Sequence, residues 1–519
     1  MQKRFNTTGC CNPEWHYMVD ISGKLAQIKT MIDNGCYFTI NRARQFGKTT
    51  SIELLYKQLI NTHTVIMLSF ESDSEDTWKD TISFCNSFVH KLIIEFGMLE
   101  RTDEKLFWEK EKPLIRTFDD LSVSITKYCQ ASNKPVVLMI DEVDKSQDNQ
   151  LFLSFLGMLR NKYLKKSVYG HNSTFHSVIL AGVYDVKNLK LKLRPNEERK
   201  YNSPWNIATD FKVDMSFCPT EIETMLNSYE TDHKTGMDIP LIANEIYKYT
   251  SGYPFLVSKI CELIDTELNK DWSILGILNA IKIIENNDEC TLIDSLIKNI
   301  ENDSEMKSFL KEMLLNNVSI EFNANIAVIK KCKLFSILKA GNNGNAIVHN
   351  HIFERVLYNY FITEKKIEIL MSDEPRSLYI KDNKLNLPLI IERFQYHMRS
   401  EYRKSDEQFI EKQGRLLFLC FLKPIINGKG FYYVEPQTRE NNRMDIVVTY
   451  GEQEFVIELK IWRGEKYEIE GKEQLSEYLA TRNLNEGYLV TFSFLKNKVV
   501  QEEPQWIEHN GKRIYEAVI

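Results

Sequence analysis

The first part of the chain alternates between short apolar runs and segments in which apolar residues recur at helical spacing. The apolar runs are typical of buried strands and cover residues 37–40, 62–70, 135–142 and 177–185. The segments around them are helical in pattern, beginning with an amphipathic stretch over 21–36. Strands that alternate with helices predict a parallel α/β sheet covered by helices on both faces.

The pattern becomes mostly helical from residue 219 to residue 370. Within the helices of 305–361, a short strand or wing is expected near Asn342–Asn345. The next stretch, 371–386, is polar and irregular, and it is the expected domain boundary.

A second alternating pattern follows this boundary. Residues 387–426 predict two helices, and the remainder predicts a small α/β domain that extends to residue 519. The expected strands are 431–438, 443–450, 454–462 and 487–494, with a helix over 471–480 before the last of them.

The composition fits several folded domains rather than one, because the chain has 519 residues of which 43% are hydrophobic. A net charge of -6 argues against a dedicated nucleic-acid coat protein, but it allows a local basic groove. No stretch approaches the roughly 18 apolar residues of a membrane helix, and the first residues lack a secretory signal pattern. A cytoplasmic protein without membrane contact is therefore expected. The ten cysteines contain no C-x-x-C pair, which argues against a zinc site or a disulfide framework.

A phosphate-binding motif follows the first predicted strand. The segment matches G-x-x-x-x-G-K-S/T except at its first position, where Arg42 replaces glycine. Backbone N–H groups at a helix N-terminus bind phosphate oxygens, Lys48 is expected to reach the β- and γ-phosphates of ATP, and Thr49 to hold Mg²⁺. The residues expected to contact the nucleotide are Arg42, Ala43, Arg44, Gln45, Phe46, Gly47, Lys48, Thr49 and Thr50.

Two acidic residues end the third apolar run and complete this prediction. Asp141 is expected to orient Mg²⁺ and bind with the cofactor, and Glu142 to act catalytically by polarising the attacking water. The alternative is that they cap a helix after a core strand. The order of both motifs in a β–α context favours an ATP and Mg²⁺ site.

A second group of charged residues lies in the C-terminal domain. Glu458 and Lys460 are two apart on one predicted strand, so their side chains share a face. A hairpin centred between Gly451 and Glu452 would place Asp445 opposite Glu458. Two carboxylates that share a divalent cation, with a lysine beside them, suit metal-dependent phosphodiester hydrolysis.

Three further residues fit this catalytic assignment. Glu411 could add a carboxylate to the metal site, and Gln474 and Tyr478 are expected on one face of the following helix because they are four residues apart. The alternative is a set of polar residues on a solvated strand face. The conjunction favours Asp445, Glu458, Lys460, Gln474 and Tyr478 as catalytic residues, with Glu411, Asp445 and Glu458 as metal ligands.

The motifs together resemble a known family. RARQFGKTT, MIDEVD, AGVYD, NSPWNIA and TSGYPFLVSKIC look like motifs of the bacterial AAA-ATPase-like family, which is related to STAND and ORC-type P-loop ATPases. Members often carry a C-terminal PD-(D/E)xK nuclease domain, which the phrase ELKIWRG and the Q-x-x-x-Y spacing also resemble. The family usually has arginine at the position of Arg42 and proline at the position of Ala43. By the same resemblance, Asp185 lies near the sensor position, and Tyr253 lies where a lid helix approaches the nucleotide.

The expected fold is therefore α/β: a P-loop parallel-sheet ATPase with a helical lid and a winged-helix module, joined to a separate α/β restriction-endonuclease-like domain. The segments are an ATPase core over 1–218, a lid over 219–289, a winged helix over 290–370, a linker over 371–386 and the nuclease-like domain over 387–519.

Three functions remain open at this point. The favoured one is a nucleotide-regulated, Mg²⁺-dependent nuclease acting on nucleic acid, with DNA the expected partner and defence against mobile DNA a suggested role. The second is a signalling ATPase whose C-terminal domain binds nucleic acid without cutting it. This is motivated by 22 Lys/Arg against 24 Asp/Glu over 371–519, a balance that also indicates help from the winged helix, a homo-oligomer or a partner. The third is an assembly protein with a degenerate nucleotide site.

Three aromatic side chains outside these motifs have simpler interpretations. Trp205 is expected to pack in a core. His349 and His351 are interpreted as ordinary histidines because no third metal ligand accompanies them.

Overall fold

The structure is a computed structural model. It describes residues 3–146, 150–183, 205–286, 290–315, 320–369, 378–382, 384–401, 411–426, 430–434, 446–461, 465–492 and 503–519. The chain forms two compact units, the first made of 1–299 with 322–352 and the second of 300–321 with 353–519. Among the described residues, no helix is long and apolar enough to cross a membrane.

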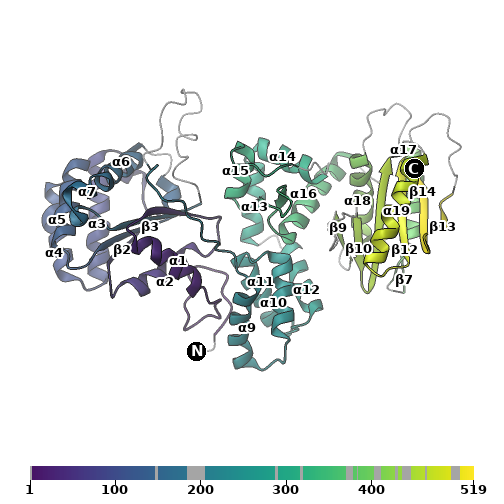
Figure 1. Cartoon of the computed structure of the whole chain (residues 1–519), viewed down its shortest axis with the longest axis horizontal. Coiled ribbons are helices and arrows are strands. Elements are labelled where there is room, and N and C mark those ends of the chain that lie inside the picture. The colour runs from purple at the N-terminus through teal and green to yellow at the C-terminus, as the bar shows by residue number, and fades with distance from the viewer. Residues whose placement is uncertain are drawn as a thin grey trace. The chain divides into compact units, whose positions relative to one another are not determined.

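The first unit is built on a four-stranded sheet in which all strands are parallel (Figure 1). The strands are β1 (Tyr37–Asn41), β2 (Thr64–Ser69), β3 (Val136–Asp141) and β4 (Ser177–Gly182), in the spatial order β1-β4-β3-β2. All four lie within or next to the predicted apolar runs, so the predicted parallel α/β sheet is confirmed. Every residue of β3 and β4 is buried, as expected for strands covered on both faces.

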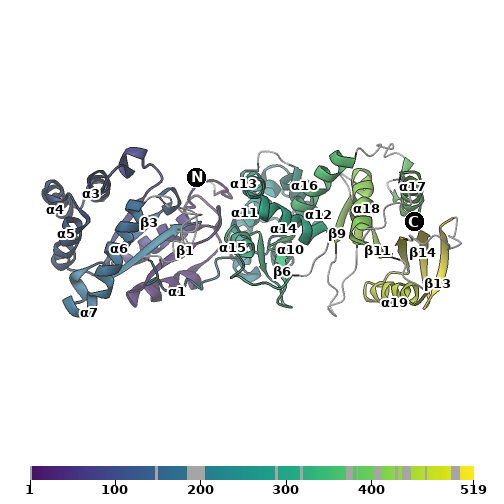
Figure 2. The ribbon, with the colours of Figure 1, turned by 90° about the horizontal axis from the view of Figure 1, so that it is seen from above.

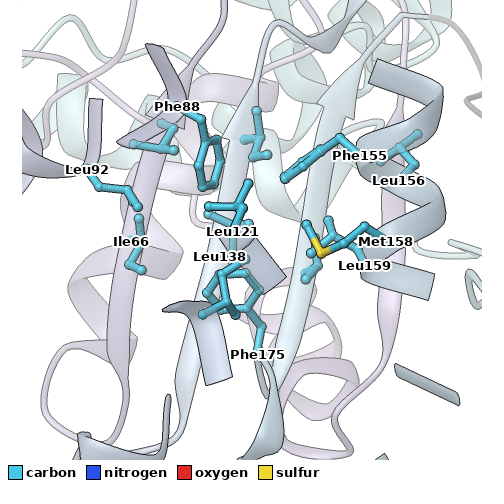
Figure 3. Packing of buried hydrophobic residues seen from close by; sticks show 14 of the residues in the cluster. Ile66, Phe88, Leu92, Leu121, Leu138, Phe155, Leu156, Met158, Leu159 and Phe175 are labelled. Atoms are coloured by element: carbon cyan, nitrogen blue, oxygen red, sulfur yellow. The ribbon is translucent and has the colours of Figure 1, made fainter. Parts of the chain in front are cut away.

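Helices surround this sheet. They are α1 (Ser22–Asp33), α2 (Lys48–Leu59), α3 (Thr81–Met98), α4 (Thr102–Glu111), α5 (Phe118–Ala131), α6 (Gln150–Leu164) and α7 (Lys166–Tyr169). Figure 3 shows the core on one face, where side chains from α3, α5 and α6 meet those of β2 and β3: Phe88, Leu92, Leu121, Phe155, Leu156, Ile66 and Leu138. Burial of these apolar side chains is the main force that holds the helices on the sheet.

The segment that begins at Trp205 lies beside the edge strand β1. Thr209 donates its backbone N–H to Tyr37 O at 2.8 Å, and Trp205 is fully buried with its Nε1 donating to Thr39 Oγ1 at 3.1 Å. The interpretation of Trp205 as a packing residue is therefore confirmed.

The predicted helical region is also observed. Its elements are α9 (Pro219–His233), α10 (Ile239–Thr250), α11 (Pro254–Thr266), α12 (Ile274–Asn286), α13 (Thr291–Glu301), α14 (Ser304–Leu315), α15 (Ala327–Leu334), β5 (Leu338–Ala340), β6 (Ala346–Val348) and α16 (His351–Ile369). The antiparallel pair β5 and β6 forms a hairpin around the expected wing at 342–345. The two-unit division assigns parts of 290–370 to each unit, so a single winged-helix module stays a prediction.

The second unit contains a six-stranded mixed sheet. Its strands are β9 (Gly430–Val434), β10 (Ile446–Tyr450), β11 (Gln453–Ile461), β12 (Glu486–Phe492), β13 (Gln505–His509) and β14 (Lys512–Val518), in the order β13-β14-β12-β11-β10-β9. Strand β12 pairs in parallel with β11 on one side and with β14 on the other. The other neighbouring pairs are antiparallel. The sequence pattern predicted four of these strands and missed β13 and β14.

Helices cover both faces of this sheet. They are α17 (Leu387–Glu401), α18 (Glu411–Ile426) and α19 (Glu465–Thr481). Figure 2 shows α19 on one face and α17 on the other. On β12, Leu489 packs in the α19 core, whereas Phe492 contacts Phe394 of α17, as the period-two alternation of a strand requires.

The stretch 371–386, predicted to be an irregular linker, contains two short strands. Residues 370–377 lie outside the described part, but β7 (Ile380–Lys381) and β8 (Lys384–Leu385) form a short antiparallel ribbon. Leu385 donates its backbone N–H to Gln453 Oε1 at 2.7 Å, so this ribbon belongs to the second unit. A polar composition did not reveal it because a two-residue strand needs almost no apolar surface.

Candidate functional site

The loop between β1 and α2 has the backbone geometry of a phosphate-binding loop. Gly47 has φ +75° and is the N-cap of α2, a conformation that glycine adopts without steric cost. Gln45 is also left-handed, with φ +57°. Helix α2 begins at Lys48, so the unpaired N–H groups of its first turn lie at the loop, where they favour an anion.

Lys48 is folded back onto this loop. Its Nζ donates to Arg42 O at 3.0 Å and to Ala43 O at 2.9 Å, and the side chain is buried. Burial lowers the pKa of Lys48, and the negative charges of nearby Asp144, Glu142 and Asp141 oppose that shift. The ammonium thus lies at the loop with carboxylates near it, and among the described residues it donates hydrogen bonds to two carbonyl oxygens.

Thr49 and Asp141 meet beside that lysine. Thr49 Oγ1 donates to Asp141 Oδ2 at 2.7 Å, and Asp141 Oδ1 accepts the backbone N–H of Glu142 at 2.8 Å. Strand β3 ends at Asp141 and therefore delivers its carboxylate to the start of α2. A hydroxyl and a carboxylate side by side are hard oxygen ligands, and they fit a Mg²⁺ ion that also contacts phosphates.

Glu142 has an unusual backbone for a non-glycine residue, with φ +53°. Burial raises the pKa of its carboxyl, and the charge of Asp141 raises it further, while Lys48 lowers it. Such a shift brings a carboxylate closer to the range in which it accepts a proton from water. The structure thus brings together Lys48, Thr49, Asp141 and Glu142, the four residues that the sequence assigned to ATP chemistry.

Arg42 does not line the start of α2. Its Nη2 donates to Val213 O at 2.7 Å, its Nη1 donates to Asn41 O at 2.9 Å, and its guanidinium lies 5.1 Å from the ring centre of Phe211. Only its backbone belongs to the loop, with its N–H donating to Gly182 O at 3.2 Å. The side chain of Arg42, which replaces the first glycine of the motif, therefore binds the segment beside β1. The predicted nucleotide contact of Arg42 then involves its backbone and not its side chain.

The other loop residues are held by distant segments. Tyr253, just before α11, donates its hydroxyl to Arg44 O at 2.7 Å, and its ring packs on Phe46 with ring centres 4.7 Å apart. Gln45 Nε2 donates to Thr291 Oγ1 at 2.8 Å. Tyr253 thus contacts the loop, as the resemblance implied for a lid residue.

Thr50 has a structural partner in the N-terminal segment. Its Oγ1 accepts the backbone N–H of Cys11 at 3.1 Å, so this hydroxyl ties residues near the N-terminus to the first turn of α2. Next to it, burial raises the pKa of Cys10 to about 12, which disfavours the thiolate form of that side chain.

Asp144 is a site residue that the sequence reasoning missed. Its Oδ2 accepts the backbone N–H of Val183 at 2.6 Å, and a Cβ on Gly182 would lie 2.7 Å from its Oδ1. The carboxylate therefore occupies the space that glycine leaves at the end of β4. A third acid shortly after Asp141 and Glu142 was the available signal. Asp185, the expected sensor residue, lies outside the described residues.

In the second unit, β10 and β11 form the predicted hairpin. Ile446 pairs with Ile457 and Tyr450 pairs with Gln453, which centres the turn between Gly451 and Glu452 as expected. Glu458 is 2% exposed, and its Oε1 lies 2.8 Å from Lys460 Nζ, so these two side chains share one face.

The other expected ligands of this site are not located. Asp445 lies outside the described residues, and α18 begins at Glu411, whose side chain is not described. Within the described residues, no group of three or more His, Cys, Asp or Glu side chains could hold a metal ion. Among the described residues, the buried carboxylate of Glu458 is an oxygen group of the kind that divalent cations bind.

Gln474 and Tyr478 differ in environment although both lie on α19. Tyr478 is buried in the apolar core with Leu475 and Leu479, whereas Gln474 is exposed. Both residues lie on one helix, four positions apart as predicted, but the ring of Tyr478 is used in packing, and their catalytic role stays a prediction.

Comparison with known proteins identifies a family for residues 16–355, which include most of the first unit. Residues 16–355 match the family model of the AAA-like domain. An uncharacterized WD repeat-containing protein of Synechocystis is 24% identical over 249 residues, which are 47% of this chain and 19% of that protein. The chain thus spans about a fifth of that relative's length.

The solved structures that match this chain are more distant from it in sequence. A Walker-type ATPase of Pyrococcus abyssi is 9% identical with a TM-score of 0.46, and the match covers 68% of this chain and 99% of that one. The ORC2 protein of Aeropyrum pernix is 11% identical with a TM-score of 0.37, covering 70% and 98%. Because the family model matches well over half of the residues, the chain belongs to the AAA-like domain family.

Proposed function

We propose that this protein binds and hydrolyses ATP, and that its nucleotide state controls metal-dependent cleavage of nucleic acid by the C-terminal domain. The observation that carries the ATP half is the 2.7 Å contact between Thr49 and Asp141, next to Lys48 and Glu142. A hydroxyl, two carboxylates and an ammonium meet at a helix N-terminus, and ATP hydrolysis uses these groups.

Each of these groups has a task in that reaction. When bound, Mg²⁺ offsets phosphate charge, and Thr49 and Asp141 would hold it. Lys48 exchanges the carbonyl oxygens of Arg42 and Ala43 for phosphate oxygens, which its position on the loop allows without a long movement. Glu142 accepts the proton of the attacking water, for which its raised pKa is suited.

The nuclease half rests on the β10–β11 hairpin. Glu458 supplies a buried carboxylate for a metal ion, and Lys460 supplies a cation that stabilises charge on the phosphate. The register supports Asp445 as the second carboxylate, because it directly precedes Ile446, and Glu458 directly follows the partner of Ile446. Glu411 is proposed as a further ligand, and Gln474 and Tyr478 as residues near the substrate.

A cleavage assay on the purified full chain tests the proposal. Plasmid DNA, single-stranded DNA and RNA are incubated with Mg²⁺ or Mn²⁺, with and without ATP. Cleavage is expected in the wild type with metal and ATP, and it should disappear in Glu458→Gln and Lys48→Ala. Glu454→Gln is the matched control, because Glu454 lies on the same strand but pairs with Arg482. Cleavage that survives in Glu458→Gln would refute the assigned site.

A second function has its own support. The described Glu458 carboxylate is already neutralised by Lys460, and the C-terminal segment 371–519 carries slightly more acids than bases. An ATP-dependent binder that does not cut would show nucleotide-dependent retention of intact DNA or RNA with either metal. Equal, negligible ATP binding by wild type and Lys48→Ala would instead favour an assembly protein without nucleotide chemistry.

A further inference from the structure

Three buried aromatic side chains from distant parts of the first unit meet at the phosphate-binding loop. Phe46 belongs to the loop, Tyr253 precedes α11, and His349 directly follows β6 of the hairpin. The ring centre of His349 lies 6.2 Å from that of Phe46 and 5.8 Å from that of Tyr253, with interplanar angles of 89° and 81°. These are edge-to-face contacts, the geometry that aromatic rings prefer.

The loop backbone is fixed by two members of this cluster. Tyr253 binds Arg44 O through its hydroxyl, and the ring of Phe46 is 3% exposed between its two neighbours. Phe46 directly precedes Gly47, the N-cap of α2, so its buried ring anchors the loop one residue before the helix begins.

His349 acts in this cluster through the shape of its ring. Its side chain is 9% exposed, and its Nδ1 is buried without a hydrogen-bond partner in the described structure. Burial lowers its pKa to about 4, with Lys339 lowering it further and Asp214 opposing, so the ring is neutral near pH 7. A neutral ring without a polar partner at Nδ1 contributes by packing against its neighbours.

The hairpin fixes where this ring lies. The backbone N–H of His349 donates to Ile337 O at 2.8 Å, next to β5. From the same hairpin, Lys339 Nζ donates to Ser251 Oγ at 2.8 Å, two residues before Tyr253. The hairpin thus contacts the Tyr253 segment at two points and reaches the phosphate-binding loop through His349.

We propose that His349 is a positioning residue for ATP: its ring supports Phe46 and Tyr253, and it thereby couples the β5–β6 hairpin to the phosphate-binding loop. This inference rests on the proposed ATP site and adds a control point to it. A ligand or partner that displaces the hairpin would weaken ATP binding, and bound ATP would in turn favour the docked hairpin.

Nucleotide affinity is the direct test. The dissociation constant of MgATP is measured by titration calorimetry together with kcat and KM for hydrolysis. Because an edge-to-face pair changes an equilibrium constant about twofold to tenfold, His349→Ala should raise the dissociation constant and KM by that factor and leave kcat nearly unchanged. His349→Phe should recover most of the affinity, and His349→Gln, which is polar without a ring, should not.

A matched control separates this role from the loss of a histidine as such. His351→Ala removes an exposed histidine two residues away. It should not change ATP affinity at a temperature where the variant is folded. In a double-mutant cycle, Phe46→Ala and His349→Ala should be non-additive because they remove the same contact.

The outcomes distinguish this inference from the function on which it depends. If wild type does not bind ATP, the proposed function and this inference both fail. If wild type binds ATP and His349→Ala binds it equally, or His351→Ala weakens binding as much, only the inference fails. If His349→Ala is unfolded, the comparison of His349→Phe with His349→Gln decides, and equal affinities would overturn it.

Discussion

Asp144 gives the sharpest prediction, because one carboxylate joins the end of β3 to the end of β4. Its Oδ2 accepts the Val183 N–H at 2.6 Å, and Gly182 leaves room for it. Two substitutions separate its geometry from its charge. Asp144→Ala removes the acceptor, whereas Asp144→Asn keeps an oxygen of similar position and removes the negative charge.

The magnitudes follow from these contacts. A backbone N–H left without an acceptor in a largely buried place costs about 1–3 kcal/mol. If that cost appears in the transition state for hydrolysis, Asp144→Ala lowers kcat about fivefold to a hundredfold. The pKa of Glu142 is raised by burial, by Asp141 and by Asp144. Asp144→Asn should therefore lower that pKa and move the acidic limb of the kcat profile to lower pH.

Phosphate release measured across acidic and neutral pH tests both effects. Asp119→Asn, on the exposed side of α5, is the control for a surface charge. The profile of the control should overlay that of wild type. If Asp144→Asn leaves the acidic limb in place and Asp144→Ala keeps the wild-type kcat, Asp144 has no positioning role.

Three other positions give predictions that separate folding from nucleotide chemistry. Arg42→Gly restores the common first glycine but loses the hydrogen bond to Val213 O, so the free energy of unfolding should fall by about 2 kcal/mol. Its affinity for ATP should equal that of wild type. Chemical denaturation measures the first effect and titration calorimetry the second. Gly252→Ala should cost about 3 kcal/mol or more, because its φ is +71° and a Cβ would lie 1.9 Å from Phe217 O; a sharply lower melting temperature is the expected readout. For His349, the folded pKa of about 4 lies below the unfolded value of 6.5. The unfolded chain therefore binds more protons between these pH values, and stability should fall as pH is lowered through this window, less so in His349→Phe.

The sequence predicted the elements whose pattern is local. β3 and β4 are runs of apolar residues, and the acids after β3 were found because they interrupt such a run. The β10–β11 register followed from the position of one turn, since side chains alternate strictly along both strands.

The missed features depend on contacts between distant residues. No local pattern indicates that the Arg42 guanidinium reaches Val213, or that His349 packs on a ring about 300 positions earlier. Strand β13 escaped prediction for a different reason. β13 carries mostly partly exposed residues at the sheet edge, so its apolar signal is weak.

The measurement that tests the central claim most directly is Mg²⁺-dependent ATP binding and turnover by wild type and Glu142→Gln. Glutamine keeps the size of Glu142 but cannot accept the proton of the attacking water. Glu142→Gln should bind MgATP about as tightly as wild type. It should hydrolyse MgATP at least about a hundredfold more slowly, which is the usual contribution of a general base. Wild-type protein that does not bind ATP, or a Glu142→Gln variant that turns it over at the wild-type rate, would contradict the account.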